Sequence, residues 1–567
     1  MSYVLGHWIS VGEYTFDLKL YLDALSSLFV IVLTGLGFFV QLYAWGDQPK
    51  TSLWVKYLAY FHLCYGFVLL LLTASSTHLF FVGWQGVSVC GFLLMGYGYE
   101  NHEKFLFKKN VFISHRLGDA ALVMFIAIGV QVFGTLEFAT ISPLQTNGVL
   151  HASYYPVWKL EGLALLLFIA CMTKAALFPL YISIPQTAKA PTAFFVLLGV
   201  ILPCMTGIYA ISRCAQLFAT TSIVSHIALW IGLMTALFGA LVAIFQYDIK
   251  KVVAYSVITH VGCAVTLIGM GSYAAGVCYA LTSTCVHVLL GLGAGSIVRG
   301  VHKTSDLRKM GGLKTRMIAT SITMICGYVS IIGIPVSSGF FSKNNAFHHV
   351  LVSGEKWVFI LFILIAVLTV VYMTRLMVLT LLGSDTRLSL EQTQKIRESP
   401  TLILIPLWVL AMMSLFGGWL VFAMYEVLTK SLPQFQYVHL LLSKTEIQLG
   451  VGVTFLVFLI VAMTIRYYGQ KSKMIEKEQR NAFLCGAKKH WYVDRFMTAG
   501  GSILMRVMAS IAHVFEWLLS KGVRDAITFV LQSFGYGIRS VATGVIQSYI
   551  FFILLGIVFL MVFSLRY

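Results

Sequence analysis

The chain has 567 residues, of which 59% are hydrophobic and 11% are charged. Because soluble domains carry about 25% charged residues, this composition excludes a soluble globular protein and indicates an integral membrane protein. The net charge of +18 lies in loops between apolar segments, which argues against a nucleic-acid partner.

Apolar segments recur along the whole chain, and about fourteen of them have the length needed to cross a membrane as helices. These segments lack the period-2 alternation of membrane strands, so we expect a helix bundle and not a β-barrel. The sequence therefore predicts an all-α integral membrane protein with about fourteen transmembrane helices. The predicted spans are 23–43, 55–74, 79–97, 110–133, 162–181, 192–212, 226–245, 252–270, 274–298, 317–340, 357–382, 402–425, 448–466 and 547–565.

The positive charges alternate from loop to loop. Loops that follow odd-numbered spans hold most of the Lys and Arg residues, as in 299–316 and 471–480. By the positive-inside rule these loops face the cytoplasm or the mitochondrial matrix, which puts the N-terminus outside. No cleavable signal peptide is recognised before the first span.

The segment after the last charged loop has a different pattern. From residue 502 toward 540, apolar side chains recur every three or four positions, with polar residues between them. This pattern predicts an amphipathic helix that lies along lipid or protein, broken near Gly522 and Gly535. The alternative is an ordinary helix within a loop. The apolar positions are Ile503, Leu504, Val507, Met508, Ile511, Val514, Phe515 and Leu518.

These patterns divide the chain into five parts. We predict an outer-face segment, a channel core, further spans, a charged inner loop with the lateral helix, and a C-terminal anchoring span. Their predicted bounds are 1–20, 21–345, 346–466, 467–546 and 547–567.

Two lysines occupy apolar runs. Lys174 lies within GLALLLFIACMTKAALFPLY, and Lys343 ends the string GFFSK. A charged side chain in the middle of a membrane costs about 2.5–3.5 kcal/mol on insertion scales, so such residues are functional candidates. The alternative for Lys343 is that its side chain reaches an interface.

Helix-breaking residues occur inside two spans. Pro203 lies within the sixth span, while Gly333 and Pro335 lie within the tenth. We predict two broken helices at these positions, because interrupted membrane helices often line cavities where freed carbonyl groups meet water or ions. Packing kinks are the alternative. The ten cysteines lie mostly in apolar segments and are interpreted as small buried side chains.

Six strings in order along the chain carry a family resemblance: Trp84-Gln85-Gly86-Val87, Arg116-Leu117-Gly118-Asp119, Lys174 with Pro179, Gln246 to Lys251 followed by Val253 to Ser256, Asp306 to Leu313, and Gly339 to Lys343. Together they resemble one family, the antiporter-like proton-channel subunits of complex I and the related Mrp antiporter subunits. The lateral helix and final anchor are similar to the chain 5 (subunit L) members in particular, although two helices that usually precede the first span are missing.

The resemblance implies a proton pathway and its residues. In the family a glutamate paired with a lysine leads through polar groups to a second lysine, and moving the carboxylate switches the lysine between holding and releasing a proton. The positions that match the pathway are Lys174, His287 and Lys343. The supporting positions are Gln85, Arg116, Asp119, Asp248, Lys250, His260, Tyr279 and Ser283.

The chain also departs from the family pattern. Gln85 takes the place of the family glutamate, and Gly199 takes the place of a histidine on the sixth span. Tyr279, Ser283 and His287 take the places of a His, His, Lys series, and Asn344 and Asn345 replace acidic positions. The implied pathway is therefore partly retained and partly neutralised.

Each candidate also has a purely structural interpretation. His287 and His260 could be hydrogen-bonded core histidines, and Arg116 and Asp119 could be a local ion pair on one helix face. Asp248 and Lys250 could organise the inner end of their helix.

By resemblance, the expected function is that of a distal membrane-arm subunit of complex I, which couples quinone reduction in other subunits to proton translocation. No cofactor is expected in this chain. Expected partners are lipids and other membrane subunits, including homologous ones, in a bacterial or mitochondrial inner membrane. The alternatives are the membrane subunit of a two-component inorganic-carbon uptake system and a Mrp-type cation/proton antiporter subunit.

Overall fold

The computed structural model describes most of the chain. It covers residues 2–11, 14–47, 52–96, 102–135, 137–138, 156–302, 304–382, 396–433, 444–469 and 523–541, with single positions between 510 and 555. The chain divides into two units, residues 1–497 and 498–567, and each is described by itself.

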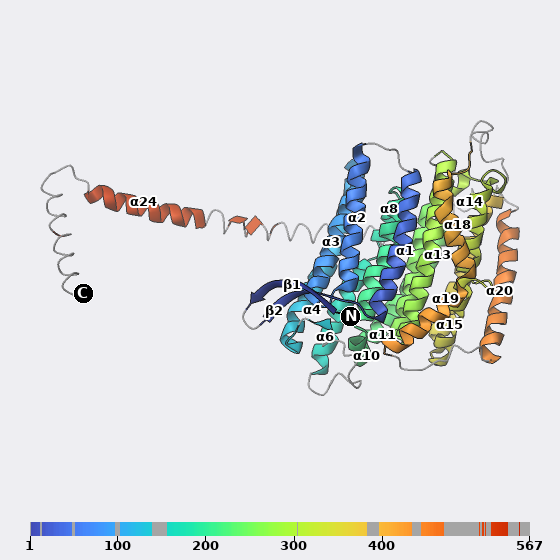
Figure 1. The fold of residues 1–567 in the computed structure, drawn as a ribbon, viewed down its shortest axis with the longest axis horizontal. Coiled ribbons are helices and arrows are strands. Elements are labelled where there is room, and N and C mark those ends of the chain that lie inside the picture. Colours follow the sequence, from blue (N-terminus) through green and yellow to red (C-terminus); the bar gives the residue numbers. More distant parts are fainter. Residues whose placement is uncertain are drawn as a thin grey trace. The chain divides into compact units, whose positions relative to one another are not determined.

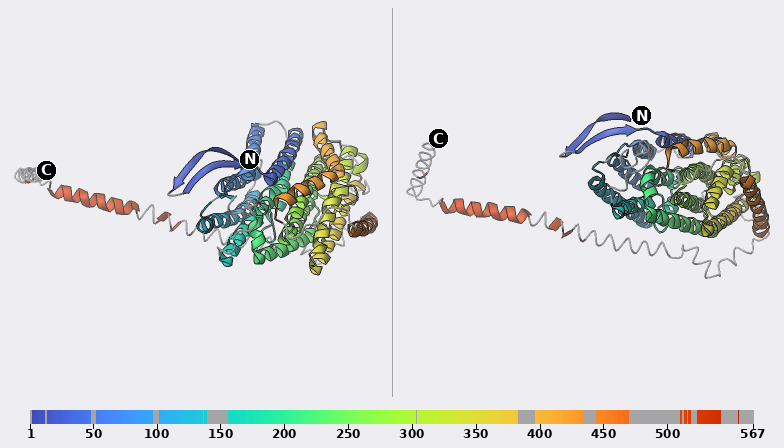
Figure 2. Two further views of the ribbon diagram at one scale, coloured as in Figure 1. Left: turned by 60° about the horizontal axis from the view of Figure 1, so that its bottom comes forward. Right: turned by 90° about the horizontal axis from the view of Figure 1, so that it is seen from below.

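The first unit is a bundle of apolar helices that stand side by side (Figure 1, Figure 2). Its long helices are α1 (Ala24–Asp47), α2 (Ser52–Thr73), α3 (Thr77–Gly96), α4 (His102–Phe133), α6 (Val157–Lys174), α11 (Ser222–Phe245), α12 (Ile249–Gly269), α13 (Tyr273–Gly300), α16 (Lys356–Met377) and α20 (Lys444–Gly469). Shorter elements complete the bundle: α7 (Ser183–Thr187), α8 (Thr192–Phe194), η2 (Phe195–Ile201), η3 (Pro203–Ile208), α9 (Tyr209–Arg213), α10 (Ala215–Thr220), η4 (Leu307–Lys309), η5 (Leu313–Thr315), α14 (Ile318–Ile332), α15 (Ser338–Val352), η6 (Val378–Leu382), α18 (Thr401–Phe416) and α19 (Gly418–Ser431).

The predicted membrane-spanning helical fold is confirmed. In the described residues, nine helices are long and apolar enough to cross a membrane, or ten if the bent pair α18 and α19 is one span. The total of fourteen stays a prediction. The last predicted span, 547–565, lies outside the described residues except for Leu555.

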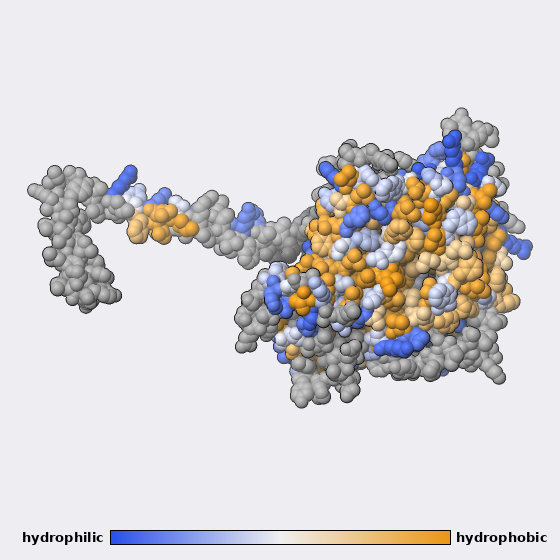
Figure 3. Space-filling model, in the orientation of Figure 1, coloured by the Kyte–Doolittle hydropathy of each residue, from blue (hydrophilic) through white to orange (hydrophobic). Residues whose placement is uncertain are grey.

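Burial separates central helices from peripheral ones. The most apolar windows of α12 and α13 are 94% and 89% buried within the protein, whereas that of α2 is only 33% buried. Peripheral helices instead expose large apolar side chains such as Ile31 and Phe38, and the outer surface is broadly hydrophobic (Figure 3). Polar groups on α12 and α13 therefore face protein rather than lipid.

The N-terminal segment, for which the sequence predicted only an outer-face location, is a β-hairpin. Its antiparallel strands are β1 (Ser2–Val11) and β2 (Tyr14–Tyr21). In β2, Phe16, Leu18 and Leu20 alternate with polar residues, which is the period-2 pattern of a strand. An isolated bridge between Leu20 and Ala74 joins the hairpin to the end of α2.

One of the two predicted helix breaks is confirmed. Helix α14 ends at Ile332, Gly333 adopts a left-handed conformation with φ of 82°, and α15 begins at Ser338. At Pro203 the helix does not break, because η2 and η3 are π-helical stretches within one continuous span. Proline lacks an N–H group and crowds the carbonyl one turn earlier, and the helix accommodates this by widening.

Two interruptions were not predicted. Helix α6 ends at Lys174, although the sequence predicts a continuous span to residue 181. Helices α18 and α19 meet at an angle of 71° around Gly417, within the predicted span 402–425. Adjacent glycines at 417 and 418 remove the side chains that would resist such a bend.

In the second unit, the structure describes helix α24 (Val523–Val541). Large apolar residues on it, including Ile527, Val530 and Phe534, are exposed (Figure 3). The helix continues through Gly535, so the break predicted there is wrong. The predicted positions Val507, Ile511 and Leu518 lie outside the described residues, and the lateral placement of this segment stays a prediction.

Candidate functional site

Lys174 is buried at the C-terminal end of α6. Its Nζ donates to the Ser88 hydroxyl and to the Trp84 carbonyl oxygen, 3.3 Å away, both on α3. The Trp84 ring centroid lies 5.0 Å from Nζ, which adds a cation–π contact. The ammonium group thus has three polar or aromatic partners from a neighbouring helix.

A carboxylate lies next to this group. Asp119 on α4 accepts a hydrogen bond from the Trp84 indole nitrogen at 2.8 Å and pairs with Arg116 at 2.7 Å. Its side chain is 6% exposed, whereas that of Arg116 is 38% exposed. Gly118 allows this arrangement, because a Cβ there would collide with Thr173 of α6. The local ion pair proposed from the sequence therefore exists, and it extends to Lys174 through Trp84.

A cavity of about 40 Å³ adjoins Lys174, with room for about three water molecules. Polar groups in its wall include Ser88, His115 and Thr187. Gln85 is half-buried and makes no hydrogen bond with Lys174 in the described structure. The position of the family glutamate therefore contributes no partner to this lysine.

Lys343 lies at the second interruption. Its Nζ donates to the Ile331 carbonyl oxygen in the last turn of α14, and its Cδ lies against Gly333. Carbonyl groups at a helix C-terminus lack backbone donors and carry partial negative charge, so an ammonium group satisfies them. The side chain therefore points into the break between α14 and α15 rather than to an interface.

The predicted histidines lie together in the centre of the bundle. The rings of His260 on α12 and His287 on α13 are 4.9 Å apart, and Tyr279 stacks on His260 at 5.8 Å. The His287 Nδ1 lies 2.6 Å from the Ser283 carbonyl oxygen. The structure thus brings four of the predicted residues into one buried cluster.

Two residues that the sequence reasoning missed join this cluster. The Ser256 hydroxyl lies 2.9 Å from His287 Nε2 and 2.9 Å from the Tyr372 hydroxyl of α16. His260 Nδ1 lies 2.9 Å from the Ser256 carbonyl oxygen. Ser256 lies in one of the strings that carry the family resemblance. Tyr372 lies in none of them, and the sequence shows it only as a polar side chain within an apolar segment.

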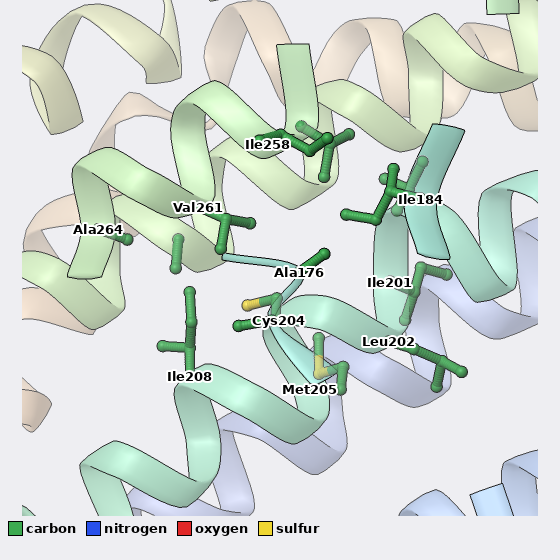
Figure 4. Close-up of a cluster of buried hydrophobic side chains, with 14 of the residues drawn as sticks. Ala176, Ile184, Ile201, Leu202, Cys204, Met205, Ile208, Ile258, Val261 and Ala264 are labelled. Carbon is green, nitrogen blue, oxygen red and sulfur yellow. The ribbon is translucent and has the colours of Figure 1, made fainter. Parts of the chain in front are cut away.

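A cluster of buried apolar side chains lies where α7, η2 and η3 meet α12 (Figure 4). Ala176, two residues after Lys174, meets side chains of η3 and α12 there. Gly199, at the position of a family histidine, provides no polar side chain in this region. The labelled members are Ala176, Ile184, Ile201, Leu202, Cys204, Met205, Ile208, Ile258, Val261 and Ala264.

Asp248 and Lys250 lie at the start of α12. Asp248 caps the helix by accepting from the backbone N–H groups of Lys250 and Lys251 at 2.9 and 3.3 Å, and it accepts from the Ser305 hydroxyl at 2.6 Å. The buried Lys250 donates to the Ala190 carbonyl oxygen at 3.1 Å. These contacts fit the structural interpretation, in which the two residues organise a helix end.

The loop that Asp248 holds has its own ion pair. Burial disfavours the charged form of Asp306, but hydrogen bonds and charge from Arg308 outweigh it and hold the pKa of this carboxyl below its usual value. Two of these hydrogen bonds join Arg308 to Asp306 at 2.6 and 3.0 Å. In the described part of the chain, no three His, Cys, Asp or Glu residues are placed to hold a metal ion.

Known proteins resemble this chain over most of its length. Residues 74–369 match the transmembrane family described as NADH:quinone oxidoreductase/Mrp antiporter, and residues 8–46 match the N-terminus of NADH-ubiquinone oxidoreductase (complex I) chain 5. The first match covers more than half of the chain and therefore shows the family.

Relatives carry names from the same family. NADH-quinone oxidoreductase subunit L of Rickettsia bellii is 30% identical over 414 residues, which are 72% of this chain and 64% of that protein. The protein of the same name from Mycobacterium tuberculosis H37Rv is 27% identical over 576 residues, 97% of this chain and 87% of that protein. The chain thus spans less than two thirds of the Rickettsia relative.

A solved structure has the same fold. The structure of the Mrp complex from Dietzia sp. DQ12-45-1b contains a chain that matches with a TM-score of 0.70 and 20% identity. The match covers 94% of this chain and 58% of that chain. At this identity the likeness establishes the fold of the bundle and nothing about its activity.

Proposed function

The chain belongs to the NADH:quinone oxidoreductase/Mrp antiporter family of membrane subunits, and we propose that it is an antiporter-like proton-translocating subunit of a complex I assembly. Quinone reduction takes place in other subunits of this assembly and drives protons through the polar centres of this chain. The match of residues 8–46 to the chain 5 N-terminus supports the complex I branch over the Mrp branch.

One observation carries the proposal: both lysines lie where a membrane helix is interrupted. Lys174 ends α6, and Lys343 fills the break between α14 and α15. Low-dielectric surroundings disfavour an ammonium group, while the carbonyl groups that accept from it favour one. Each lysine therefore sits where a modest movement of its partners changes whether it holds a proton.

At the first centre, Asp119 supplies the carboxylate that position 85 lacks. It shares Trp84 with Lys174 and is held by Arg116. When Asp119 is nearer to Lys174 it stabilises the charged lysine, and when it turns to Arg116 it releases that stabilisation. Water in the adjacent cavity provides the proton donor and acceptor at this centre.

The second centre comprises Lys343 and the buried histidine cluster, and here hydroxyl and imidazole groups form the proton route. Ser256 lies within hydrogen-bond distance of both His287 and Tyr372, and a hydroxyl can donate and accept at the same time. Imidazole likewise accepts a proton at one nitrogen and releases it from the other. The side chains labelled in Figure 4 are apolar, so proton transfer through that cluster would require water to enter it.

A Mrp-type antiporter subunit is the second candidate, supported by the fold it shares with a chain of the Dietzia Mrp complex. The identity of copurifying proteins separates the possibilities. Purification from native membranes under mild detergent should recover many respiratory subunits with NADH:quinone activity. Recovery of only a few small antiporter subunits favours the Mrp function, and recovery of one soluble zinc protein favours the carbon-uptake function.

Translocation itself is tested with lysine variants in the assembled complex. Lys174→Ala and Lys343→Ala should each lower the number of protons moved per NADH oxidised while the complex still assembles. Lys314→Ala is the matched control, because Lys314 is exposed in the loop between α13 and α14. Unchanged proton stoichiometry in both variants would leave the bundle with only a structural role.

A further inference from the structure

A third buried polar group lies outside the pathway described above. His349 on α15 is 4% exposed, and both of its ring nitrogens have hydroxyl neighbours. Nδ1 lies 3.0 Å from Ser272 Oγ, and Nε2 lies 2.9 Å from the Tyr425 hydroxyl. Because a hydroxyl can either donate or accept, this arrangement suits a ring that takes up a proton on one side and gives it up on the other.

A polar stripe on α15 leads from the helix break to this ring. Ser338, Ser342, Asn345 and His349 follow one another at spacings of four, three and four residues, which places them on one helix face. All four are buried within the protein, and the stripe starts beside Lys343. Ser338 donates to the Ser414 carbonyl oxygen at 2.9 Å and Ser342 donates to that of Gly339 at 3.3 Å, and a row of polar residues of this kind on a membrane helix is a candidate proton path.

Two helices and one turn hold the ring at one end of the bundle. Ser272 lies in the turn between α12 and α13 and is partly exposed, while Tyr425 lies on α19 beyond the bend. Helices α15 and α19 lie at the same end of the bundle as the N-terminal hairpin (Figure 1). Helix α19 packs against α15 through Phe341 and Phe422, whose ring centroids are 5.1 Å apart.

We propose that His349, with Ser272 and Tyr425, is the group through which protons pass between the Lys343 centre and the aqueous side nearest the N-terminal hairpin. This inference rests on the proposed function. Helix α15 contains no Asp or Glu between Ser338 and Val352, so no carboxylate on it can carry the proton to the aqueous side. We assign this last transfer step to the histidine.

The transfer balances without electrons. The Tyr425 hydroxyl passes its proton to Nε2 and takes another from water in the stripe, while Nδ1–H passes its proton to Ser272 Oγ. Ser272 releases its own proton to the aqueous side. Lys343 restores the proton that the stripe water gave up. A neighbouring water molecule then takes the Nε2 proton and delivers a proton to Nδ1, which restores the starting tautomer, so one proton has moved from Lys343 to the aqueous side.

A structural role for His349 makes a different prediction. In a structural role, the ring would only hydrogen-bond α15 to α19 and to the turn at Ser272, and an amide side chain could form the same hydrogen bonds. Glutamine carries both a donor and an acceptor but cannot take up a proton near neutral pH. His349→Gln therefore preserves the hydrogen bonds of a purely structural role and removes the capacity to transfer a proton.

The experiment measures protons moved per NADH oxidised by the full complex in sealed membranes. We expect His349→Gln to lose the same share of translocation as Lys343→Ala, and the double variant to lose no more than either one, because the two residues act in series. His226→Gln, at an exposed histidine on α11, is the matched control and should behave as wild type. Tyr425→Phe should lose part of the same share.

The outcomes separate this inference from the proposed function. Normal translocation in His349→Gln together with loss in Lys343→Ala overturns the role of His349 and leaves the proposed function intact. Normal translocation in Lys343→Ala alone overturns this inference, and normal translocation in both Lys343→Ala and Lys174→Ala counts against the proposed function itself. If His349→Gln assembles poorly, Ser272→Ala decides instead, because the residue lies in a partly exposed turn, and normal translocation in that variant also overturns the inference.

Discussion

The indole nitrogen of Trp84 donates to Asp119 at 2.8 Å, while the carbonyl oxygen of Trp84 accepts from Lys174 at 3.3 Å. One residue therefore connects the acid of α4 to the lysine of α6. The next residue, Gln85, takes part in neither contact. Asp119 and Lys174 are thus linked by hydrogen bonds to the same residue, Trp84. Gln85, at the position where the family has a glutamate, is uncharged.

Asp119→Asn should lower proton translocation without preventing insertion of the bundle. The substitution keeps the shape of the side chain and its bond from Trp84 but leaves Arg116 and Lys174 without a carboxylate. Because the Arg116 side chain is 38% exposed, breaking its pair with Asp119 should cost less than the ~3–5 kcal/mol of a fully buried pair, while the ammonium form of Lys174 loses the negative charge that stabilises it. Protons moved per NADH oxidised provide the readout, with the exposed Glu355→Gln as control.

Gln85→Glu should partly restore translocation to the Asp119→Asn variant. A carboxylate at position 85 would return negative charge to the helix that already holds Ser88 and Trp84, the two partners of Lys174. The double variant is compared with each single variant in sealed membranes. Equal activity of Asp119→Asn with and without Gln85→Glu would mean that Asp119 acts through Arg116 alone.

The sequence predicted the two lysines because a charge in an apolar run stands out on energetic grounds alone. It did not predict Tyr372, Ser256 or His349 as pathway residues, because a tyrosine, serine or histidine in a membrane helix changes hydropathy little. Their significance depends on which neighbours they meet across helices, and that information is tertiary. The hydropathy pattern of one sequence does not show which side chains on different helices are in contact.

The helix interruptions show the same limit. The break at Gly333 and Pro335 was predictable because both residues are poor in helix interiors, and the structure has it. The bend at Gly417 lies between helices whose sequence is otherwise uniformly apolar, and glycine is common in membrane helices, so the residue type alone does not identify it. The end of α6 at Lys174 lies five residues before Pro179, and proline disfavours helical geometry in the residue that precedes it, so the sequence does contain a signal for this interruption.

Tyr372→Phe should lower translocation while leaving the bundle stable. The variant removes one hydroxyl from the Ser256 contact, and loss of a buried hydrogen bond costs only about 1 kcal/mol. Ser256 keeps its contact with His287, so the histidine cluster should persist. Tyr328→Phe, which removes a hydroxyl bonded to Thr374 instead, is a matched control and should translocate normally. Equal loss in both variants would assign the effect to packing.

Cysteine labelling should place the loop between α13 and α14 on the inner side. Lys314→Cys should react with a membrane-impermeant reagent only when the inner face is accessible, whereas Glu355→Cys should react only from the outer face, because the residues lie at opposite ends of the span that α14 and α15 form. Both positions are exposed. The reverse pattern would invert the predicted orientation.

Val530→Asp should weaken association of this subunit with its complex, and Gln532→Asp should not. Exposed apolar residues Ile527, Val530 and Phe534 recur at three- and four-residue spacing on α24, so they form one face of the helix. A helix of this length is only marginally stable alone, and its apolar face gains free energy by covering lipid or protein. A charge at Val530 penalises that burial, while Gln532 lies two positions away on the other face. Native gel analysis of detergent-solubilised membranes should show smaller assemblies for Val530→Asp alone. Intact assemblies in both variants would show that this face of α24 is not a contact that holds the complex together.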